Sequence, residues 1–105
     1  MNGKVISVTT YVLKAGTEDL LLPELESLIE VIRQIEGCLA FDLYRLSESR
    51  QTLVLHETWE TEEAYRGYAL SPLPRQLASL FVHYVAQPPQ TWQVEEICCW
   101  RARSE

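Results

Sequence analysis

The strand-like segments of this sequence carry large apolar side chains on both alternating sets of positions, and no other feature limits the possible folds as much. Residues 5–13 read VISVTTYVL, and their β-branched and aromatic side chains are typical of a strand. Successive side chains of a strand point to opposite faces, so apolar residues in both sets indicate a central strand that is covered on both sides. One set contains Val5, Tyr11 and Leu13, and the other contains Ile6, Val8 and Val12.

Three further segments, residues 38–46, 51–59 and 91–99, have the same strand character. The polar residues 47–50 between the first two predict a hairpin turn. The order β-α-β-β-α-β predicts an α+β, ferredoxin-like fold, in which a four-stranded antiparallel sheet carries helices on one face. The apolar positions with helical periodicity are Leu25, Leu28, Ile29, Ile32 and Ile35, and then Leu73, Leu77, Leu80, Phe81 and Tyr84.

Short signals mark where the helices begin and end. Thr17 is expected to cap the first helix, and Pro23 either kinks this helix or marks a second start. Gly37 is expected to supply its C-terminal stop. Thr61 is expected to cap the second helix. This helix breaks and restarts at Ser71-Pro72, with the serine as the cap and the proline in the first helical position.

Large apolar groups also occupy the sheet face that the helices do not cover. Such a face needs a partner, and the partner that the sequence favours is a second copy of the chain. We therefore expect a homodimer in which two sheets pack face to face. The length of 105 residues predicts one domain over residues 1–105, with a core of about residues 5–97 and a C-terminal tail over 98–105.

Charge and composition exclude several classes of function. The formal net charge is −6 and the basic residues are scattered, whereas a nucleic-acid-binding surface needs clustered Lys and Arg. No apolar run reaches the ~18 residues of a transmembrane helix, and the N-terminus has no signal-peptide pattern, so we expect a cytoplasmic protein without membrane contact. Cys38, Cys98 and Cys99 fit no zinc-binding spacing, and we expect no metal site.

Three passages carry a resemblance to a known family. They are IEGCLAFDLY from Ile35, LVLHETWETEEAY from Leu53 and LSP from Leu70, and together they resemble the antibiotic biosynthesis monooxygenase (ABM) domain family. The resemblance extends over about residues 5–97. Its most specific parts are the E-G-C sequence before the second strand and the E-x-W-x-x-x-x-A-Y passage. It implies a dimeric α/β barrel, in agreement with the dimer expected from the two apolar sheet faces.

The resemblance transfers to individual residues only in part. Trp59 and Tyr65 match a Trp and Tyr pair of the family members that oxygenate aromatic polyketides, whereas the Asn of those members is replaced by Leu55. The quinol-oxidising members carry His at the positions that hold Tyr68 and Leu73 in this chain. The fold signature is therefore retained better than the chemistry of any one subfamily.

The haem-opening members use an Asn, a Trp and a His at positions that hold Thr9, Tyr68 and Ala78 here, so their axial iron ligand is missing. A haem-degrading oxygenase is therefore the third and disfavoured function. The resemblance implies instead a cofactor-free monooxygenase that acts on a small phenolic or quinol-like aromatic substrate with molecular oxygen. The alternative is a non-enzymatic module of the same fold that binds a small ligand or serves dimerisation.

A cofactor-free oxygenase needs a site that holds the substrate, favours its deprotonated form and excludes water. We expect this site between sheet and helices, with Trp59, Tyr65 and Tyr68 as its catalytic polar aromatics; packing in the core is the alternative for these residues. Histidine is the side-chain type whose charge ordinarily changes near neutral pH, and His56 is either a catalytic base or a histidine on the dimer face. The residues expected to bind the substrate are Thr9, Tyr11, Phe41, Leu55, Phe81 and Tyr84.

Glu57 stands among apolar residues in the middle of the third strand. We expect it to pair with Arg45 across the hairpin. The alternative is a buried acid with a raised pKa.

Overall fold

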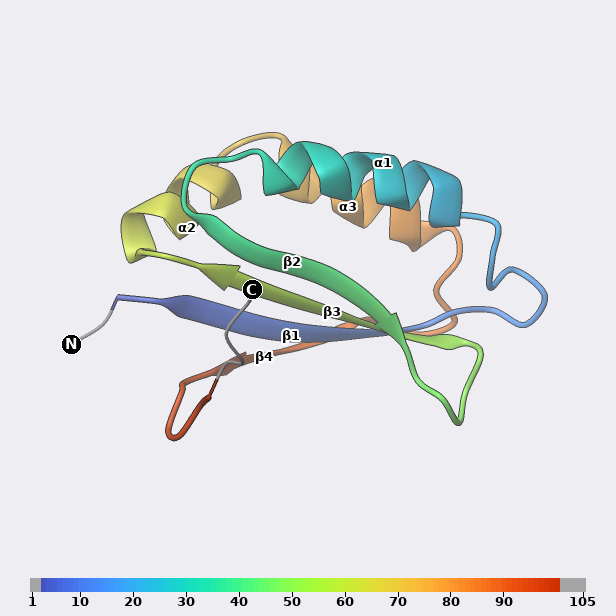
Figure 1. The fold of residues 1–105 in the computed structure, drawn as a ribbon. Helices are drawn as coiled ribbons and strands as arrows, with labels where there is room; N and C mark the ends of the chain where they lie inside the picture. The colour runs from blue at the N-terminus through green and yellow to red at the C-terminus, as the bar shows by residue number, and fades with distance from the viewer. Residues whose placement is uncertain (1–2, 101–105) are drawn as a thin grey trace, which may run out of the picture.

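A four-stranded antiparallel sheet is covered on one face by three helices, as Figure 1 shows. The computed structural model describes residues 3–100. The element order and the strand order β2-β3-β1-β4 confirm the expected ferredoxin-like α+β fold, with the second helical segment divided in two. The strands are β1 (Val5–Val12), β2 (Cys38–Arg45), β3 (Thr52–Trp59) and β4 (Gln90–Val94), and the helices are α1 (Leu22–Arg33), α2 (Glu62–Ala69) and α3 (Leu73–Val82).

The two central strands are β1 and β3, which run antiparallel and bring their side chains into register. Ser7 lies opposite Glu57 and Thr9 lies opposite Leu55. Directly paired residues of antiparallel strands point to the same face of the sheet. Because Leu55 is buried in the core beneath the helices, the polar residues of these two pairs also face the helices.

A β-bulge at the start of β2 changes which side chains share a face. The register shifts between Cys38 and Ala40, so that β2 gains one residue relative to β3. Cys38 and Phe41 both pack in the core under the helices, while Leu39 is 53% exposed. Strict alternation along β2 would place Leu39 on the face of Phe41, and the added residue is the reason that it does not hold at this point.

The first helix begins later than expected. The Thr17 hydroxyl donates to the carbonyl of Lys14 at 2.7 Å in a turn, so it does not cap a helix. Helix α1 begins at Leu22 with Pro23 in its first turn, which confirms the second start that the proline offered. The helix ends at Arg33, ahead of Gly37, whose φ of 91° turns the chain into β2.

The boundaries of α2 and α3 agree with the sequence almost to the residue. The Thr61 hydroxyl accepts a hydrogen bond from the backbone N–H of Ala64 at 3.0 Å, and this confirms the expected cap. The chain breaks and restarts at Ser71-Pro72 as expected, but Pro72 is the cap residue of α3 and not its first helical residue. The Ser71 hydroxyl instead accepts from the N–H of Leu73 at 3.3 Å.

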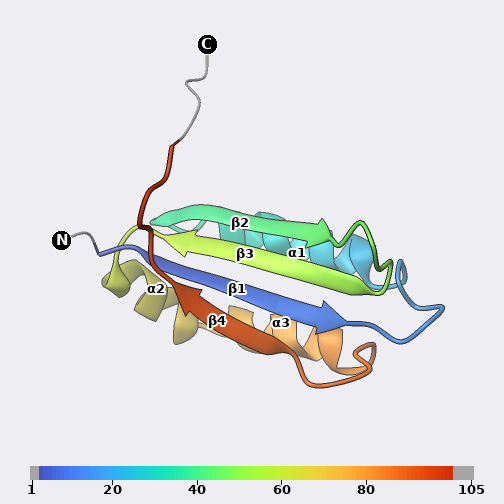
Figure 2. The same cartoon turned by 90° about the horizontal axis from the view of Figure 1, so that it is seen from below.

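The last strand is shorter than expected. Strand β4 ends at Val94 rather than at Cys99, and Figure 2 shows the chain leaving the sheet there. Cys98 and Cys99 follow the strand as exposed, free thiols. Residues 101–105 of the expected tail lie outside the described residues.

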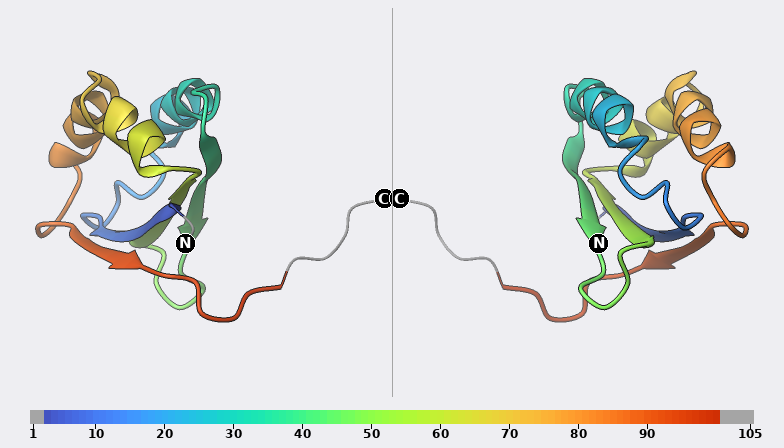
Figure 3. Two further views of the ribbon diagram at one scale, coloured as in Figure 1. Left: turned by 90° about the vertical axis from the view of Figure 1, so that its left-hand side faces the viewer. Right: turned by 90° about the vertical axis from the view of Figure 1, so that its right-hand side faces the viewer.

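The core fills the layer between sheet and helices, which the end-on views of Figure 3 show most clearly. Trp59 and Phe41 are fully buried there. Within residues 3–100, no helix is long and apolar enough to cross a membrane. The sheet face away from the helices carries no helix from this part of the chain.

Candidate functional site

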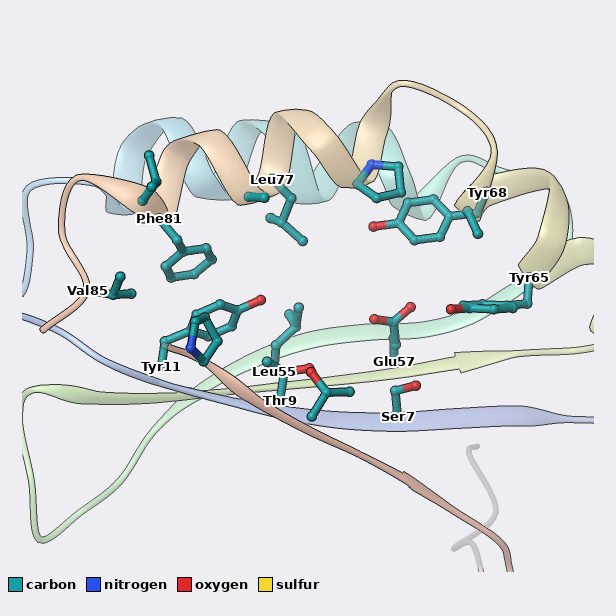
Figure 4. Close-up of a pocket in the computed structure, with 16 residues that line it drawn as sticks. Ser7, Thr9, Tyr11, Leu55, Glu57, Tyr65, Tyr68, Leu77, Phe81 and Val85 are labelled. Carbon is teal, nitrogen blue, oxygen red and sulfur yellow. The ribbon is translucent and has the colours of Figure 1, made fainter. Parts of the chain in front are cut away.

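A cavity of about 600 Å³ lies between the sheet and helices α2 and α3 (Figure 4). Ligand sites are typically concave, of this size and mostly apolar, with a few polar groups that fix orientation. The cavity fits that description, since its apolar walls come from both layers. These apolar side chains are Leu55, Ala69, Pro74, Leu77, Ala78, Phe81, Val82, Val85 and Pro89.

Three tyrosines line the cavity, beside the smaller hydroxyl side chains of Ser7, Thr9 and Thr91. Tyr11 enters from β1, and Tyr65 and Tyr68 enter from α2. In Figure 4 the hydroxyls of Tyr11 and Tyr68 point into the cavity from opposite ends, and that of Tyr65 points toward Glu57. Within residues 3–100 these three hydroxyls make no hydrogen bond and are not sealed off, so each is available to a ligand.

Helix α2 places two of these tyrosines three residues apart, so both lie on one side of the helix. The cap at Thr61 fixes where the helix starts, and therefore the direction in which Tyr65 and Tyr68 project. Tyr68 is held further by its ring. It stacks on Trp59 with 4.8 Å between ring centroids, and the edge of Phe41 meets it at 6.0 Å.

Glu57 projects from β3 into the same cavity. The indole N–H of Trp59 donates to its Oε1 at 2.8 Å. Burial raises the pKa of the Glu57 carboxyl, and the Trp59 hydrogen bond offsets part of this rise. The expected pair with Arg45 is wrong, since Arg45 donates to Asp19 at 2.8 Å. The alternative of a buried acid describes the structure.

The environment of the cavity keeps Tyr11 and Tyr68 protonated. Burial raises the pKa of Tyr11 and of Tyr68, and the negative charge of Glu57 raises both further. A phenol with a raised pKa stays a hydrogen-bond donor at neutral pH. The arrangement can therefore offer several neutral donors and one acidic acceptor to a bound molecule.

The structure brings together six of the ten residues expected at the site and separates four. Trp59 and Phe41 lie behind Tyr68, fully buried, and do not line the cavity. Tyr84 packs against the core beside it. His56 lies on the opposite sheet face, where a 3.4 Å hydrogen bond joins it to Thr58. The residues that line the cavity are Thr9, Tyr11, Leu55, Tyr65, Tyr68 and Phe81.

Three polar residues of the cavity, Ser7, Glu57 and Thr91, were not among the expected site residues. Strand alternation contains the signal for Ser7 and Glu57. Ser7 shares its face with Thr9 and Tyr11, and Glu57 shares its face with Leu55, so the same face that supplies the walls also supplies these groups. In residues 3–100 no group of three or more His, Cys, Asp or Glu side chains is placed to hold a metal ion.

Comparisons with known proteins agree with this architecture. A family model described as antibiotic biosynthesis monooxygenase matches residues 4–77. A crystal structure of an antibiotic biosynthesis monooxygenase superposes with a TM-score of 0.79 at 21% identity, covering 90% of this chain and 99% of the other. At such identity the likeness shows the fold alone. No curated protein matches the sequence significantly.

Two further solved structures share the fold. The protein Rv0793 from Mycobacterium tuberculosis has 19% identity and a TM-score of 0.80, with 91% of this chain and 97% of the other covered. A conserved protein from Methanosarcina mazei Go1 has 18% identity and a TM-score of 0.81, with 90% and 93% covered.

Proposed function

Because this chain belongs to the antibiotic biosynthesis monooxygenase family, we propose that it is a cofactor-free monooxygenase for a small phenolic or quinol-like aromatic compound. The observation that carries the proposal is the cavity with apolar walls, which the hydroxyls of Tyr11 and Tyr68 enter from opposite ends while that of Tyr65 points toward Glu57. An aromatic ligand gains from the apolar lining, and its oxygen substituents meet the hydroxyls at the ends of the cavity.

The chemistry asks little of the protein. An anthrone-type substrate, R₂CH₂, takes up one O₂ and gives the ketone R₂C=O and one H₂O, so the reaction balances without an added reductant. The substrate supplies the electrons once it has lost a proton. The site has to bind it, favour its anion and exclude water.

We assign the donor roles to Tyr65 and Tyr68. Their phenol hydroxyls are placed to stabilise negative charge on a substrate oxygen. Tyr11 and Phe81 form the opposite wall, where they stack on each other. Trp59 supports Tyr68 from behind rather than touching the substrate.

We also propose that two copies of the chain pack through the uncovered sheet face. His56 stands there between Asp42 and Val8, and Trp92 continues the same row across β4. Trp92 and Tyr44 are 49% and 55% exposed on this face, which is large for aromatic side chains of a small domain. Light scattering at micromolar concentration tests this, with twice the 12.1 kDa mass of one chain expected and the mass of one chain contradicting it.

Oxygen consumption tests the activity. Anthrones and hydroquinones are incubated with and without the protein in an oxygen electrode, and the protein is expected to accelerate uptake for at least one of them. A thermal shift with these compounds but no oxygen uptake would favour the non-enzymatic binding module. The absence of both oxygen uptake and a thermal shift would overturn the proposal. A haem titration without a change in the Soret band is expected, because Ala78 stands where the haem-opening members have their His.

A further inference from the structure

We infer that Glu57 is the hydrogen-bond acceptor and general base of the cavity, and that the cavity takes a neutral aromatic ligand that bears an acidic hydroxyl and no anionic group. The inference rests on the proposed function only for the reaction that follows proton transfer. The binding preference that it states stands on the geometry of the cavity.

The two oxygens of the Glu57 carboxylate have different surroundings. Oε1 accepts the indole N–H of Trp59, and the full burial of that indole leaves it no water to donate to. Oε2 receives no donor from residues 3–100, yet it is not sealed off, and Figure 4 shows the carboxylate pointing into the cavity. An ionised carboxylate oxygen without a donor is costly away from bulk water. A ligand hydroxyl that donates to Oε2 removes that cost.

The charge of the lining excludes one class of ligand. Glu57 carries the only formal charge among the lining residues, and none of them is Lys, Arg or His. Acidic ligands such as carboxylates and phosphates would bring a second negative charge close to Glu57 where no cation compensates either charge. A neutral ligand with a hydroxyl group meets an acceptor and three phenol donors instead.

The same groups account for a proton transfer that leaves the net charge of the cavity unchanged. The O–H bond of the ligand breaks and an O–H bond forms on Oε2 of Glu57, so one negative charge moves from the carboxylate to the ligand oxygen. Tyr11 and Tyr68 remain neutral donors, and together with the Tyr65 hydroxyl they can hydrogen-bond to the new oxyanion. The net charge of the cavity is the same before and after the step. The acid Glu57 then returns the proton when product leaves.

Three naphthalenes of similar size test the inference by fluorescence titration at neutral pH. They are 2-naphthol, 2-methoxynaphthalene, which lacks the donor, and 6-hydroxy-2-naphthoate, which adds an anionic group. With the wild-type protein we expect 2-naphthol to bind about tenfold more tightly than each of the other two, as one charge-assisted hydrogen bond supplies.

Glu57→Gln is the diagnostic variant, since the amide oxygen can still accept the Trp59 indole N–H and the fold is retained. It is expected to bring the three affinities within about threefold of one another, through weaker binding of 2-naphthol and tighter binding of the naphthoate. Glu63→Gln on the exposed side of α2 removes the same charge outside the cavity and should leave the wild-type order unchanged.

Three results would overturn the inference: no binding of 2-naphthol, equal affinity of the wild type for 2-naphthol and the naphthoate, or an unchanged order in Glu57→Gln. The ranking in the wild type needs no variant, so a folding defect in Glu57→Gln does not spoil the test. If the expected order is found without oxygen uptake on any substrate, the oxygenase proposal fails and the binding preference stands. If oxygen is consumed but the expected order of affinities is not found, the oxygenase proposal stands and the inferred binding preference fails.

Discussion

The ring of Tyr11 on β1 lies parallel to the ring of Phe81 on α3, with 3.6 Å between their centroids and 5° between their planes. This stack joins the central strand to the last helix at one end of the cavity. It covers one face of the tyrosine with carbon and leaves the hydroxyl directed into the open space. The contact therefore serves the core and the cavity at once.

Phe81→Ala is expected to lower the free energy of unfolding by about 3–5 kcal/mol, since Phe81 is 2% exposed and its removal leaves a void beside Tyr11. Urea denaturation measures the change. The neighbouring Val82, which is 60% exposed, provides the control, and Val82→Ala should change stability by about 0.5 kcal/mol or less. Equal effects at the two positions would contradict the stacked arrangement.

Tyr68→Phe is expected to reduce kcat for the oxygenated substrate by about tenfold or more, because it removes a donor from the developing oxyanion and keeps the ring that packs on Trp59. Tyr65→Phe is expected to act in the same direction. Tyr44→Phe removes a hydroxyl from the uncovered sheet face and is the matched control, with no expected change. Full activity in both cavity variants would move the catalytic site elsewhere.

Glu57 should make stability depend on pH in a defined direction. Its folded-state pKa is raised by burial, so the folded protein holds the proton more tightly than the unfolded chain does. The contribution to stability is complete below the ordinary glutamate pKa and is lost as pH rises through the folded-state pKa. Urea denaturation of the wild type and of Glu57→Gln at several pH values isolates the contribution of the Glu57 carboxyl to stability.

The free energy of unfolding of the wild type minus that of Glu57→Gln is expected to fall as pH rises. The fall begins near the ordinary glutamate pKa and ends once the pH is above the folded-state pKa. A difference that rises with pH over the same window would mean that the folded protein stabilises the charged carboxylate. Tyr65 faces this group as well, and the Tyr11 and Tyr68 phenols and the Cys38 thiol, whose pKa values are all raised, stay uncharged in that window.

Gly37→Ala should destabilise the protein by at least about 1 kcal/mol. The residue has a φ of 91°, and an added Cβ would overlap the Cβ of Ala64 on α2. Gly16→Ala separates the effect of the positive φ from that of the steric overlap, because Gly16 has a φ of 85° but nothing within 4 Å of an added Cβ. The thermal midpoint of Gly37→Ala should therefore fall further than that of Gly16→Ala. A smaller loss at Gly37 would show that helix α2 can move away at little cost.

The sequence predicts the layers of this fold well because its strong signals are local and repeated. Periodicity distinguishes helix from strand, and the cap at Thr61 and the break at Ser71-Pro72 depend on residues that act on their immediate neighbours. Thr17 carries the same local signal as Thr61. Its hydroxyl bonds to the turn carbonyl of Lys14 instead, and no local rule decides between these two partners.

The residues that line the cavity are harder to predict from the sequence. Several aromatic side chains are buried near it, and only the three-dimensional packing decides which of them contact the open space. Trp59 and Tyr68 are both buried aromatics with a polar group, and the sequence favours both as site residues. The indole N–H of Trp59 donates to Glu57, whereas the Tyr68 hydroxyl makes no hydrogen bond within residues 3–100. The bulge at Cys38 is equally hard to predict, because it arises from the pairing of β2 with β3 and no residue type in β2 indicates it.

Trp59 also gives the protein an optical property. Its fully buried indole touches the Glu57 carboxylate at the ring nitrogen and the Tyr68 ring on its face, and both of these neighbours line the cavity. The other two tryptophans, Trp92 and Trp100, are 49% and 83% exposed. With those two replaced by Phe, the intrinsic emission of the protein comes from a chromophore in direct contact with the cavity walls, and occupancy can be followed without an attached label.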